Sequence, residues 1–200
     1  NHIYSAADNS QPTIIASLDL SAAIDTIDHG ILLSRLHSEF GISGAALEWI
    51  RSYLTGRSQR VTVGHSHSSY QSVSSGVPQG SVLGPLLFTC YISPAGHLIN
   101  SFGIFHQQYA DDMQLFIEMS SNAAATAIHQ LERCLSALHC WLCLNGLSLN
   151  PDKSEAIWLS TVQRSRSFTP ATSISIAGTS ISLSDTLTTL GVTIDKNLTF

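Results

Sequence analysis

One short segment constrains the fold of this chain more than any other, the apolar run IIASLDL at residues 14–20. It is rich in β-branched residues and therefore predicts a buried strand, which we expect to end at Asp19. A carboxylate inside a protein is costly unless it is paired or bound to a metal ion. The fold must therefore provide a partner for Asp19 at the end of an interior strand.

Further apolar patterns predict the helices and strands of an α+β fold. Apolar residues at helical spacing predict a helix over 28–40 that stops at Gly41, and a second helix that Ser43 caps and Gly56 ends. We expect the helices to pack on one face of a largely antiparallel sheet. Other predicted helices cover 86–92 and 123–144, predicted strands cover 59–63, 70–74, 102–105, 113–117, 156–159, 173–176 and 190–194, and 160–189 is otherwise expected to be loop and short hairpin.

The composition favours a folded domain without a membrane span. Hydrophobic residues make up 44% of the chain and charged residues only 12%, which argues against disorder and suggests extensive buried surface. No apolar run reaches the roughly 18 residues that span a bilayer. The net charge of −5 counts against a nucleic-acid partner. An active site that binds metal ions concentrates carboxylates, however, while the basic surfaces of a longer parent protein can lie elsewhere.

The four cysteines predict neither a zinc site nor a redox pair. Cys140 and Cys143 form a CxxC motif beside His139, but no second ligand pair occurs at a matching interval. The surrounding stretch has the pattern of an apolar helix. We therefore interpret the cysteines as core residues of an intracellular protein in a reducing compartment.

A second acidic feature is the pair Asp111–Asp112, in a tight turn expected at Tyr109–Asp112 between two strands. Aspartates are common in turns because they cap backbone N–H groups, so the pair has a purely structural interpretation. Nucleotide transfer to a 3′-hydroxyl gives it a catalytic one, since two Mg²⁺ ions held by carboxylates activate the hydroxyl and neutralise the leaving pyrophosphate. The glycine-rich loop 76–84 (GVPQGSVLG) shifts the balance towards catalysis.

Five segments together resemble the motifs of non-LTR (LINE-type) reverse transcriptases. Residues 17–36 (SLDLSAAIDTIDHGILLSRL) resemble motif A, residues 76–88 (GVPQGSVLGPLLF) motif B, and residues 109–112 (YADD) motif C. Residues 146–159 (GLSLNPDKSEAIWL) resemble motif D, and residues 190–195 (LGVTID) the primer-grip region, motif E. Their order and spacing are those of the family, and the wording of motif A is similar to its CR1, L2 and Jockey-like branch.

The resemblance implies a polymerase palm, a ferredoxin-like antiparallel sheet with helices packed on one face, together with part of the fingers. Residues 1–160 would form the palm with partial fingers, and residues 161–200 the end of the palm with the primer-grip hairpin. The upstream fingers strands, the thumb and the endonuclease would belong to the parent polyprotein. We therefore expect the isolated chain to show little or no polymerase activity.

The resemblance also implies roles for individual residues. Asp19 and Asp111 would bind two Mg²⁺ ions, for which Mn²⁺ is an alternative, and Asp112 would support the ion at the primer end. Lys153 would protonate or neutralise the leaving pyrophosphate, although a solvated loop lysine is an equally good interpretation. The nucleotide and template would contact Leu20, Ser21, Ile24, Pro78, Gln79, Gly80, Ser81, Tyr109 and Ala110, and the primer terminus would contact Leu190 and Gly191.

Ile24 departs from the family pattern, in which Phe or Tyr stands five residues after the first catalytic aspartate and excludes a 2′-hydroxyl. Isoleucine is shorter, so discrimination against ribonucleotides is open. Viral RNA polymerases carry an aspartate at this position and Gly-Asp-Asp in motif C. Here Asp25 comes one residue too late and the turn reads YADD, which disfavours that family.

The resemblance predicts an RNA-directed DNA polymerase that uses an RNA template, a DNA primer and deoxynucleoside triphosphates, in the nucleus during integration and without a membrane. A non-catalytic retrotransposon remnant, kept as a nucleic-acid-binding scaffold or without function, is the alternative that Ile24 and the acidic charge favour. The basic cluster of Arg51, Arg57 and Arg60 either contacts the template backbone or lies at a solvated helix end.

Overall fold

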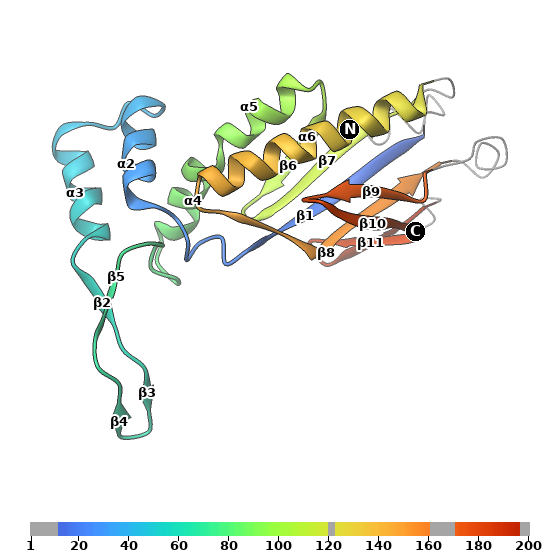
Figure 1. The fold of residues 1–200 in the computed structure, drawn as a ribbon. Helices are drawn as coiled ribbons and strands as arrows, with labels where there is room; N and C mark the ends of the chain where they lie inside the picture. Colours follow the sequence, from blue (N-terminus) through green and yellow to red (C-terminus); the bar gives the residue numbers. More distant parts are fainter. Residues whose placement is uncertain (1–11, 120–122, 161–170, 197–200) are drawn as a thin grey trace. The chain divides into compact units, whose positions relative to one another are not determined.

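The computed structural model describes residues 12–119, 123–160 and 171–196, which form two compact units (Figure 1). The sheet unit takes in the described residues up to Ser21, those from Ala95 to Cys143 and those from Ser148 onward. The helix–hairpin unit takes in Ala22–Pro94 and Leu144–Leu147. The boundary expected between residues 160 and 161 adjoins a stretch outside the described residues and stays a prediction.

The sheet unit is built on a six-stranded, largely antiparallel sheet. Its order is β6 (Phe105–Tyr109), β7 (Asp112–Glu118), β1 (Thr13–Ser21), β8 (Ser148–Leu159), β10 (Thr179–Ser184) and β9 (Ser173–Ile176), with only β10 parallel to its neighbour β8. The predicted α+β class is therefore confirmed. Strand β1 lies between β7 and β8 and is almost wholly buried, as its apolar sequence predicts, but it ends at Ser21 and not at Asp19.

Helices cover one face of this sheet, and a small hairpin also packs against the sheet. Figure 1 shows α5 (Pro94–Ser101) and α6 (Ala124–Leu144) on the same side of the strands. The hairpin of β11 (Thr186–Thr189) and β12 (Val192–Asp195) packs through Leu187 and Ile194 against an apolar cluster that includes Ile15 and Phe116. No helix among the described residues is long and apolar enough to cross a membrane.

The cysteines follow the core interpretation only in part. Cys134 is buried in α6, and burial raises the pKa of its thiol to about 11. Cys140 and Cys143 are exposed, so placing them in the core was wrong. The CxxC pair lies on the solvent side of a helix whose buried stripe passes through Leu135, Leu138 and Leu142.

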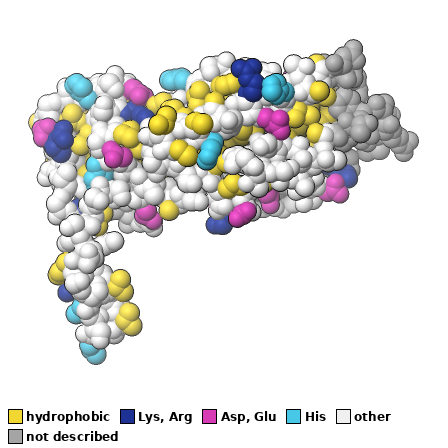
Figure 2. Space-filling view, in the orientation of Figure 1, with side chains coloured by type: hydrophobic (Ala, Val, Ile, Leu, Met, Phe, Trp, Pro, Cys, Tyr) yellow, Lys and Arg dark blue, Asp and Glu magenta, His cyan; other side chains and the backbone are white. Residues whose placement is uncertain are grey.

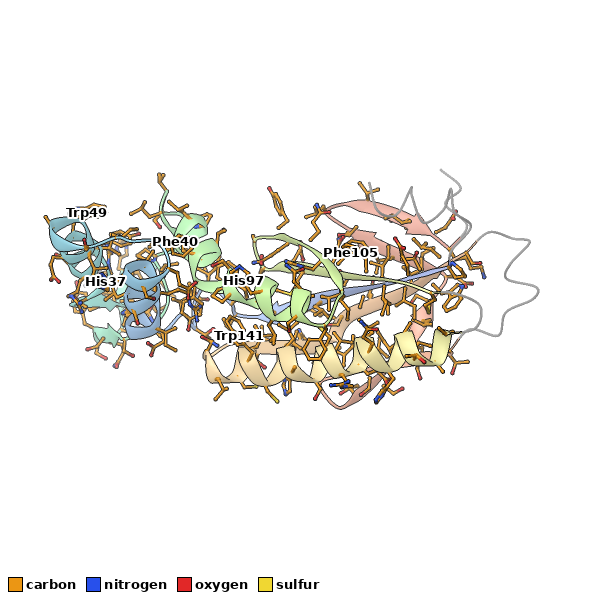
Figure 3. The ribbon with its side chains drawn as sticks, turned by 90° about the horizontal axis from the view of Figure 1, so that it is seen from above. His37, Phe40, Trp49, His97, Phe105 and Trp141 are labelled. Carbon is orange, nitrogen blue, oxygen red and sulfur yellow. The ribbon has the colours of Figure 1, made fainter. Side chains whose placement is uncertain are left out.

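The helix–hairpin unit begins with α2 (His29–Ser38) and α3 (Gly44–Leu54). Asp28 caps α2, since its carboxylate accepts a hydrogen bond from the Ile31 amide at 2.8 Å. Ser43 stands at the N-cap of α3 as expected, although its side chain forms no capping hydrogen bond. Figure 3 labels Trp49 on α3, where it is 60% exposed. The predicted helix boundaries are thus confirmed to within a few residues.

A long hairpin follows α3 and differs from the two continuous strands predicted. It consists of two short ladders, β2 (Arg57–Gln59) with β5 (Gln71–Val73) and β3 (Thr62–Val63) with β4 (Ser66–His67). Residues 60–61 and 68–70 between them are not paired as strands. Figure 2 shows hydrophobic side chains along this hairpin, which has little core of its own to bury them. Helix α4 (Gly84–Ile92) then begins after the glycine-rich loop.

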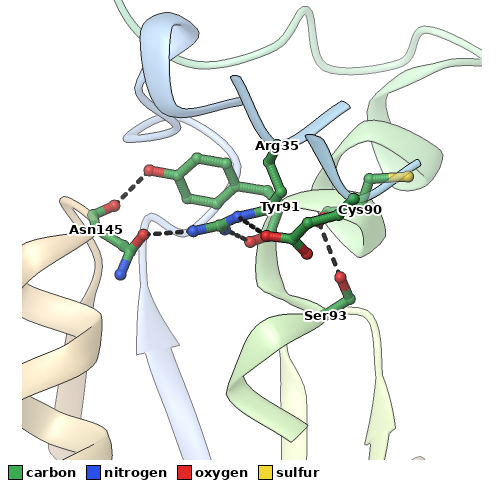
Figure 4. Close-up of polar contacts among 6 residues, drawn as sticks. Arg35, Cys90, Tyr91, Ser93 and Asn145 are labelled. Atoms are coloured by element: carbon green, nitrogen blue, oxygen red, sulfur yellow. Dashed lines mark hydrogen bonds and ion pairs between the residues drawn. The ribbon is translucent and has the colours of Figure 1, made fainter. Parts of the chain in front are cut away.

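A buried polar network holds the helix–hairpin unit together (Figure 4). The Tyr91 hydroxyl donates to the Asn145 carbonyl at 2.5 Å, and the Arg35 guanidinium donates to the Tyr91 carbonyl and, at 2.7 Å, to the Asn145 side chain. Arg35 also pairs with Glu39 at 3.5 Å. Burial lowers the pKa of Arg35, and the two carbonyl partners together with Glu39 offset that cost.

Candidate active site

The sheet brings the three predicted metal-binding aspartates together. Leu18 pairs with Met113 across β1 and β7, so the next residue along β1, Asp19, lies beside Asp112. Tyr109 pairs with Asp112 at the end of the β6–β7 hairpin, which leaves Ala110 and Asp111 as a two-residue turn. Ala110 adopts a φ of 53°, a backbone conformation typical of such tight turns. The turn predicted at the YADD sequence is therefore confirmed, although β6 begins at Phe105 and not at Phe102.

The electrostatics of this site reflect three carboxylates in proximity. The pKa of Asp112 is raised above its ordinary value, first by partial burial and then by the negative charges of Asp111 and Asp19. Within the described ranges, no Lys or Arg forms an ion pair with any of the three. No ion pair within the described part of the chain therefore compensates this repulsion, and a bound cation would relieve it.

These carboxylates do not form a closed cage of metal ligands. Among the described residues, no group of three or more His, Cys, Asp or Glu side chains is arranged to hold a metal ion on its own. Mg²⁺ typically binds through one or two carboxylates and completes its shell with water and substrate phosphates. An open set of aspartates with an uncompensated negative charge fits that kind of site better than it fits a preformed all-protein site.

The β11–β12 hairpin lies on the same face of the sheet as Asp112. Alternate residues of a strand share a face, so Asp112, Gln114 and Phe116 point the same way. The Gln114 side chain donates to the Thr189 hydroxyl, and Phe116 packs with Leu187. The predicted primer-grip pair lies at the tip of this hairpin. Leu190 and Gly191 have φ values of 48° and 78° and form the turn between strands, so the strand predicted from residue 190 begins only at Val192.

Ser154 is a positioning residue that the sequence did not reveal. The buried Ser154 hydroxyl accepts a hydrogen bond from the backbone amide of Asp19 at 3.2 Å and donates to the Asn150 carbonyl at 2.8 Å. The pairing of β1 with β8 is irregular here, because its register shifts between Ser17 and Asp19. Strand β8 thus carries a bulge, and Lys153 beside it is exposed. The strand spans Ser148–Leu159 and is longer than the predicted 156–159.

The glycine-rich loop is fastened to the segment that follows β1, within the helix–hairpin unit. The Gly76 amide donates to the Ile27 carbonyl at 2.8 Å, and the Val77 amide donates to the Ile24 carbonyl at 3.1 Å. The Gly76 carbonyl lies 2.7 Å from His29 Nε2. Gly76 has a φ of +79°, and a Cβ there would lie 2.7 Å from the Asp25 carbonyl oxygen. Glycine is therefore required at this position both for its conformation and for lack of space.

Gln79 and Asp25 form a pair that the sequence did not indicate. The Gln79 amide nitrogen lies 2.8 and 3.0 Å from the two carboxylate oxygens of Asp25, across 54 residues of sequence. Both side chains line a cavity of about 630 Å³ within this unit. Its other lining residues are Leu54, Arg57, Ser58, Gln59, Ser72, Val73, Ser74, Ser75, Gly76, Val77 and Pro78.

The remaining predicted site residues divide between the two units, each of which is described by itself. Leu20 is buried and Ser21 exposed at the end of β1, and Tyr109 is exposed at the end of β6. Ile24, half-buried, belongs to the helix–hairpin unit, as does the loop residue Gly80. Pro78 and Ser81 are joined by a hydrogen bond from the Ser81 amide to the Pro78 carbonyl, at 3.2 Å. The substrate contacts proposed for these residues stay predictions.

Residues 2–194 match the family model described as "Reverse transcriptase (RNA-dependent DNA polymerase)". The chain is 30% identical over its whole length to "Probable RNA-directed DNA polymerase from transposon BS" of Drosophila melanogaster, covering 22% of that protein. It is 28% identical to "RNA-directed DNA polymerase from mobile element jockey" of Drosophila funebris, with 92% of this chain and 20% of the relative aligned. The chain thus spans about a fifth of these relatives.

Solved structures of telomerase share the fold. A telomerase from Candida tropicalis in complex with a fragment of telomeric RNA superimposes with a TM-score of 0.68, 13% identity and coverage of 99% of this chain and 32% of the other. The apo enzyme truncated from its C-terminal domain gives a TM-score of 0.65 at 13% identity, with coverage of 99% and 37%. The polymerase-palm fold is therefore confirmed.

Proposed function

Because this chain belongs to the reverse transcriptase (RNA-dependent DNA polymerase) family, we propose that it is the catalytic core of an RNA-directed DNA polymerase of a non-LTR retrotransposon. It would add deoxynucleotides to the 3′-hydroxyl of a DNA primer on an RNA template. The observation that carries the proposal is the group of Asp19, Asp111 and Asp112 at neighbouring strand ends, with its uncompensated repulsion at Asp112.

In this proposal the three aspartates hold divalent cations, Mg²⁺ or Mn²⁺. Asp19 and Asp111 would bind two ions and Asp112 one of them. When bound, such ions supply a lowered pKa at the attacking hydroxyl and charge neutralisation at the leaving pyrophosphate. The protein's own contribution is to hold the carboxylates in place, through the two-residue turn at Ala110–Asp111 and through the Ser154 hydroxyl bound to the Asp19 amide.

Other residues would bind and orient the substrates. The Leu190–Gly191 turn shares a face of the sheet with Asp112, as expected of a primer contact near the reacting 3′-hydroxyl. Lys153 is exposed beside the β8 bulge, and an ammonium group there could donate a proton to the leaving pyrophosphate. Gln79, held by Asp25, would face the nucleotide and template together with Pro78 and the residues that follow it.

The test is Mg²⁺-dependent primer extension on a poly(rA)/oligo(dT) substrate. This chain would replace the corresponding segment of the jockey polymerase, whose own flanking regions complete the enzyme. We expect synthesis that Asp111→Asn abolishes and that Glu118→Gln, at the opposite end of β7, leaves unchanged. Equal extension by the Asp111→Asn variant would refute the assignment of the metal site.

Ile24 favours a second candidate, a retrotransposon remnant that binds nucleic acid without catalysis. Its side chain stands where the resembling enzymes carry an aromatic ring below the deoxyribose. In the same grafted enzyme, recovery of synthesis by Ile24→Phe would show damage at the sugar pocket. Absence of synthesis in both forms, with RNA–DNA binding independent of Mg²⁺, would favour the scaffold. We propose a nuclear location during integration for the active form, which imaging of a tagged parent element would test.

A further inference from the structure

We propose that α3 and the hairpin after it form a binding surface for single-stranded RNA, distinct from the acidic site. The surface consists of two clusters within the helix–hairpin unit, one of Trp49, Tyr53 and Arg57 and one of Arg60 and Tyr70. The choice of RNA rests on the proposed function, whose template is RNA. The existence of a surface for single strands rests on the geometry alone.

The first element of this surface is a column of planar groups four residues apart. The rings of Trp49 and Tyr53 are nearly parallel, with centroids 6.1 Å apart and an interplanar angle of 13°. The Arg57 guanidinium lies 4.7 Å from the Tyr53 ring centroid, and its Nε donates to the Tyr53 carbonyl at 2.6 Å. Trp49 and Tyr53 lie one turn apart on α3, and Arg57, which follows the helix at the start of β2, continues the stack with a cation. Trp49 remains 60% exposed.

The Tyr53 ring is held in this column by its faces and not by its hydroxyl. The hydroxyl is buried and has no hydrogen-bond partner among the described residues. A buried hydroxyl without a partner costs roughly 1–3 kcal/mol. The arrangement is therefore not the best one for Tyr53 as a core residue, whereas it does extend a flat stack from Trp49 to Arg57.

The hairpin repeats the same combination of groups. The Arg60 guanidinium lies 5.0 Å from the centroid of the Tyr70 ring, which is 64% exposed. Val61 and Val63, which follow Arg60 in the chain, are also exposed. Bases stack on exposed aromatic rings and on arginine planes, and such stacking tolerates any base sequence.

The charge of the segment is complementary to a polyanion. Residues 49–75 contain Arg51, Arg57, Arg60, His65 and His67 and no Asp or Glu, in a chain whose net charge is −5. Among the ion pairs of the described residues, only one involves these side chains, and it pairs Arg51 with Glu48 at 3.3 Å. No magenta side chain appears on the visible face of the hairpin in Figure 2. An acidic residue on the hairpin would repel a polyanion, and residues 55–75 contain none.

Two features favour a single-stranded and ribose-containing partner. A duplex hides the faces of its bases, so stacked side chains can bind only unpaired ones. Arg57 also lines the cavity described above, together with the hydroxyl and amide groups of Ser58, Gln59 and Ser72. These groups can both donate to and accept from a 2′-hydroxyl, which deoxyribose lacks.

The test measures binding without catalysis. Fluorescence anisotropy would follow a labelled, unstructured 15-nucleotide RNA added to the 200-residue chain in EDTA, so that the acidic site takes no part. We expect Trp49→Ala to weaken binding roughly 5- to 150-fold, the range measured for loss of one stacked base. Arg60→Ala should weaken binding and reduce the slope of log affinity against log salt concentration by about 0.7, the value for one phosphate of a single strand.

Arg133→Ala supplies the matched control, because Arg133 lies 6.0 Å from the Phe102 ring in the sheet unit. This variant should leave the RNA affinity unchanged. Circular dichroism should show the wild-type folded signal for every variant. Equal affinities for Trp49→Ala and wild type would overturn the surface, and so would equally tight binding of duplex DNA. Equal affinity for DNA of the same sequence would overturn the assignment to RNA. Loss of primer extension with Trp49-dependent RNA binding intact would refute the proposed function alone.

Discussion

Replacement of Gly76 by alanine should destabilise the chain more than the same change at Gly80. Both glycines have left-handed backbone conformations, with φ values of +79° and +76°. A Cβ at Gly80 would meet nothing within 4 Å, so Gly80→Ala should cost about 1–2 kcal/mol from conformation alone. At Gly76 the Cβ would lie 2.7–2.9 Å from three backbone atoms of Asp25. Backbone cannot rotate away as a side chain can, and overpacking adds about 1–3 kcal/mol.

Urea unfolding of the two variants and the wild type, followed by circular dichroism, measures this difference. With a denaturant slope of about 2 kcal/mol per molar urea, the midpoint of Gly76→Ala should fall roughly 0.5–1.5 M below that of Gly80→Ala. The cost of the positive φ is common to both variants and cancels in the comparison. The remaining difference in the free energy of unfolding therefore reports how closely Gly76 approaches Asp25. Midpoints that agree within experimental error would refute the claim that this contact is tight.

Three further outcomes are expected. Asp112→Asn should stabilise the metal-free chain, because the raised pKa of Asp112 means that its charged form opposes folding. The gain should be absent in acid, grow as the pH rises from the ordinary aspartate pKa to the raised one, and persist above it, as urea unfolding in EDTA would measure. Tyr91→Phe should lower the free energy of unfolding by about 1–3 kcal/mol in the same assay, since the buried hydrogen bond from the Tyr91 hydroxyl to the Asn145 carbonyl is lost. Asp25→Ala should raise the KM for deoxynucleotides about two- to tenfold in the grafted polymerase, the worth of one net hydrogen bond to Gln79. An unchanged KM would exclude a positioning role for Asp25.

Features that depend on neighbouring residues in the chain could be predicted from the sequence. The buried run 14–20, the helix over 28–40 and the helix 123–144 each follow from a local pattern, and β9 occupies Ser173–Ile176 as predicted. The tight turn at Ala110–Asp111 also follows, since two strand-like runs flank it. Local rules suffice there because the same residues determine both conformation and burial.

Features that depend on strand register or on contacts distant in sequence could not be predicted. Ser154 reaches Asp19 only because β8 bulges against β1, and nothing in the sequence around Pro151 indicates which residue the bulge turns inward. Leu190 has the apolar character of a strand residue but takes a left-handed turn conformation because Gly191 follows it in a hairpin tip. The exposure of Cys140 likewise depends on which side of α6 meets the sheet.

The course of the chain through its two units has a consequence for the order of folding. The helix–hairpin unit is interrupted in sequence: its last four residues, Leu144–Leu147, are synthesised after the 49 residues from Ala95 to Cys143 that belong to the other unit. Among those four is Asn145, the partner of the buried Arg35 guanidinium 110 residues earlier. A ribosome-bound chain that ends before Asn145 therefore carries a cation that it cannot bury with all its partners. The hydrogen bonds that join Arg35, Tyr91 and Asn145 can therefore form only after the whole of α6 has been synthesised.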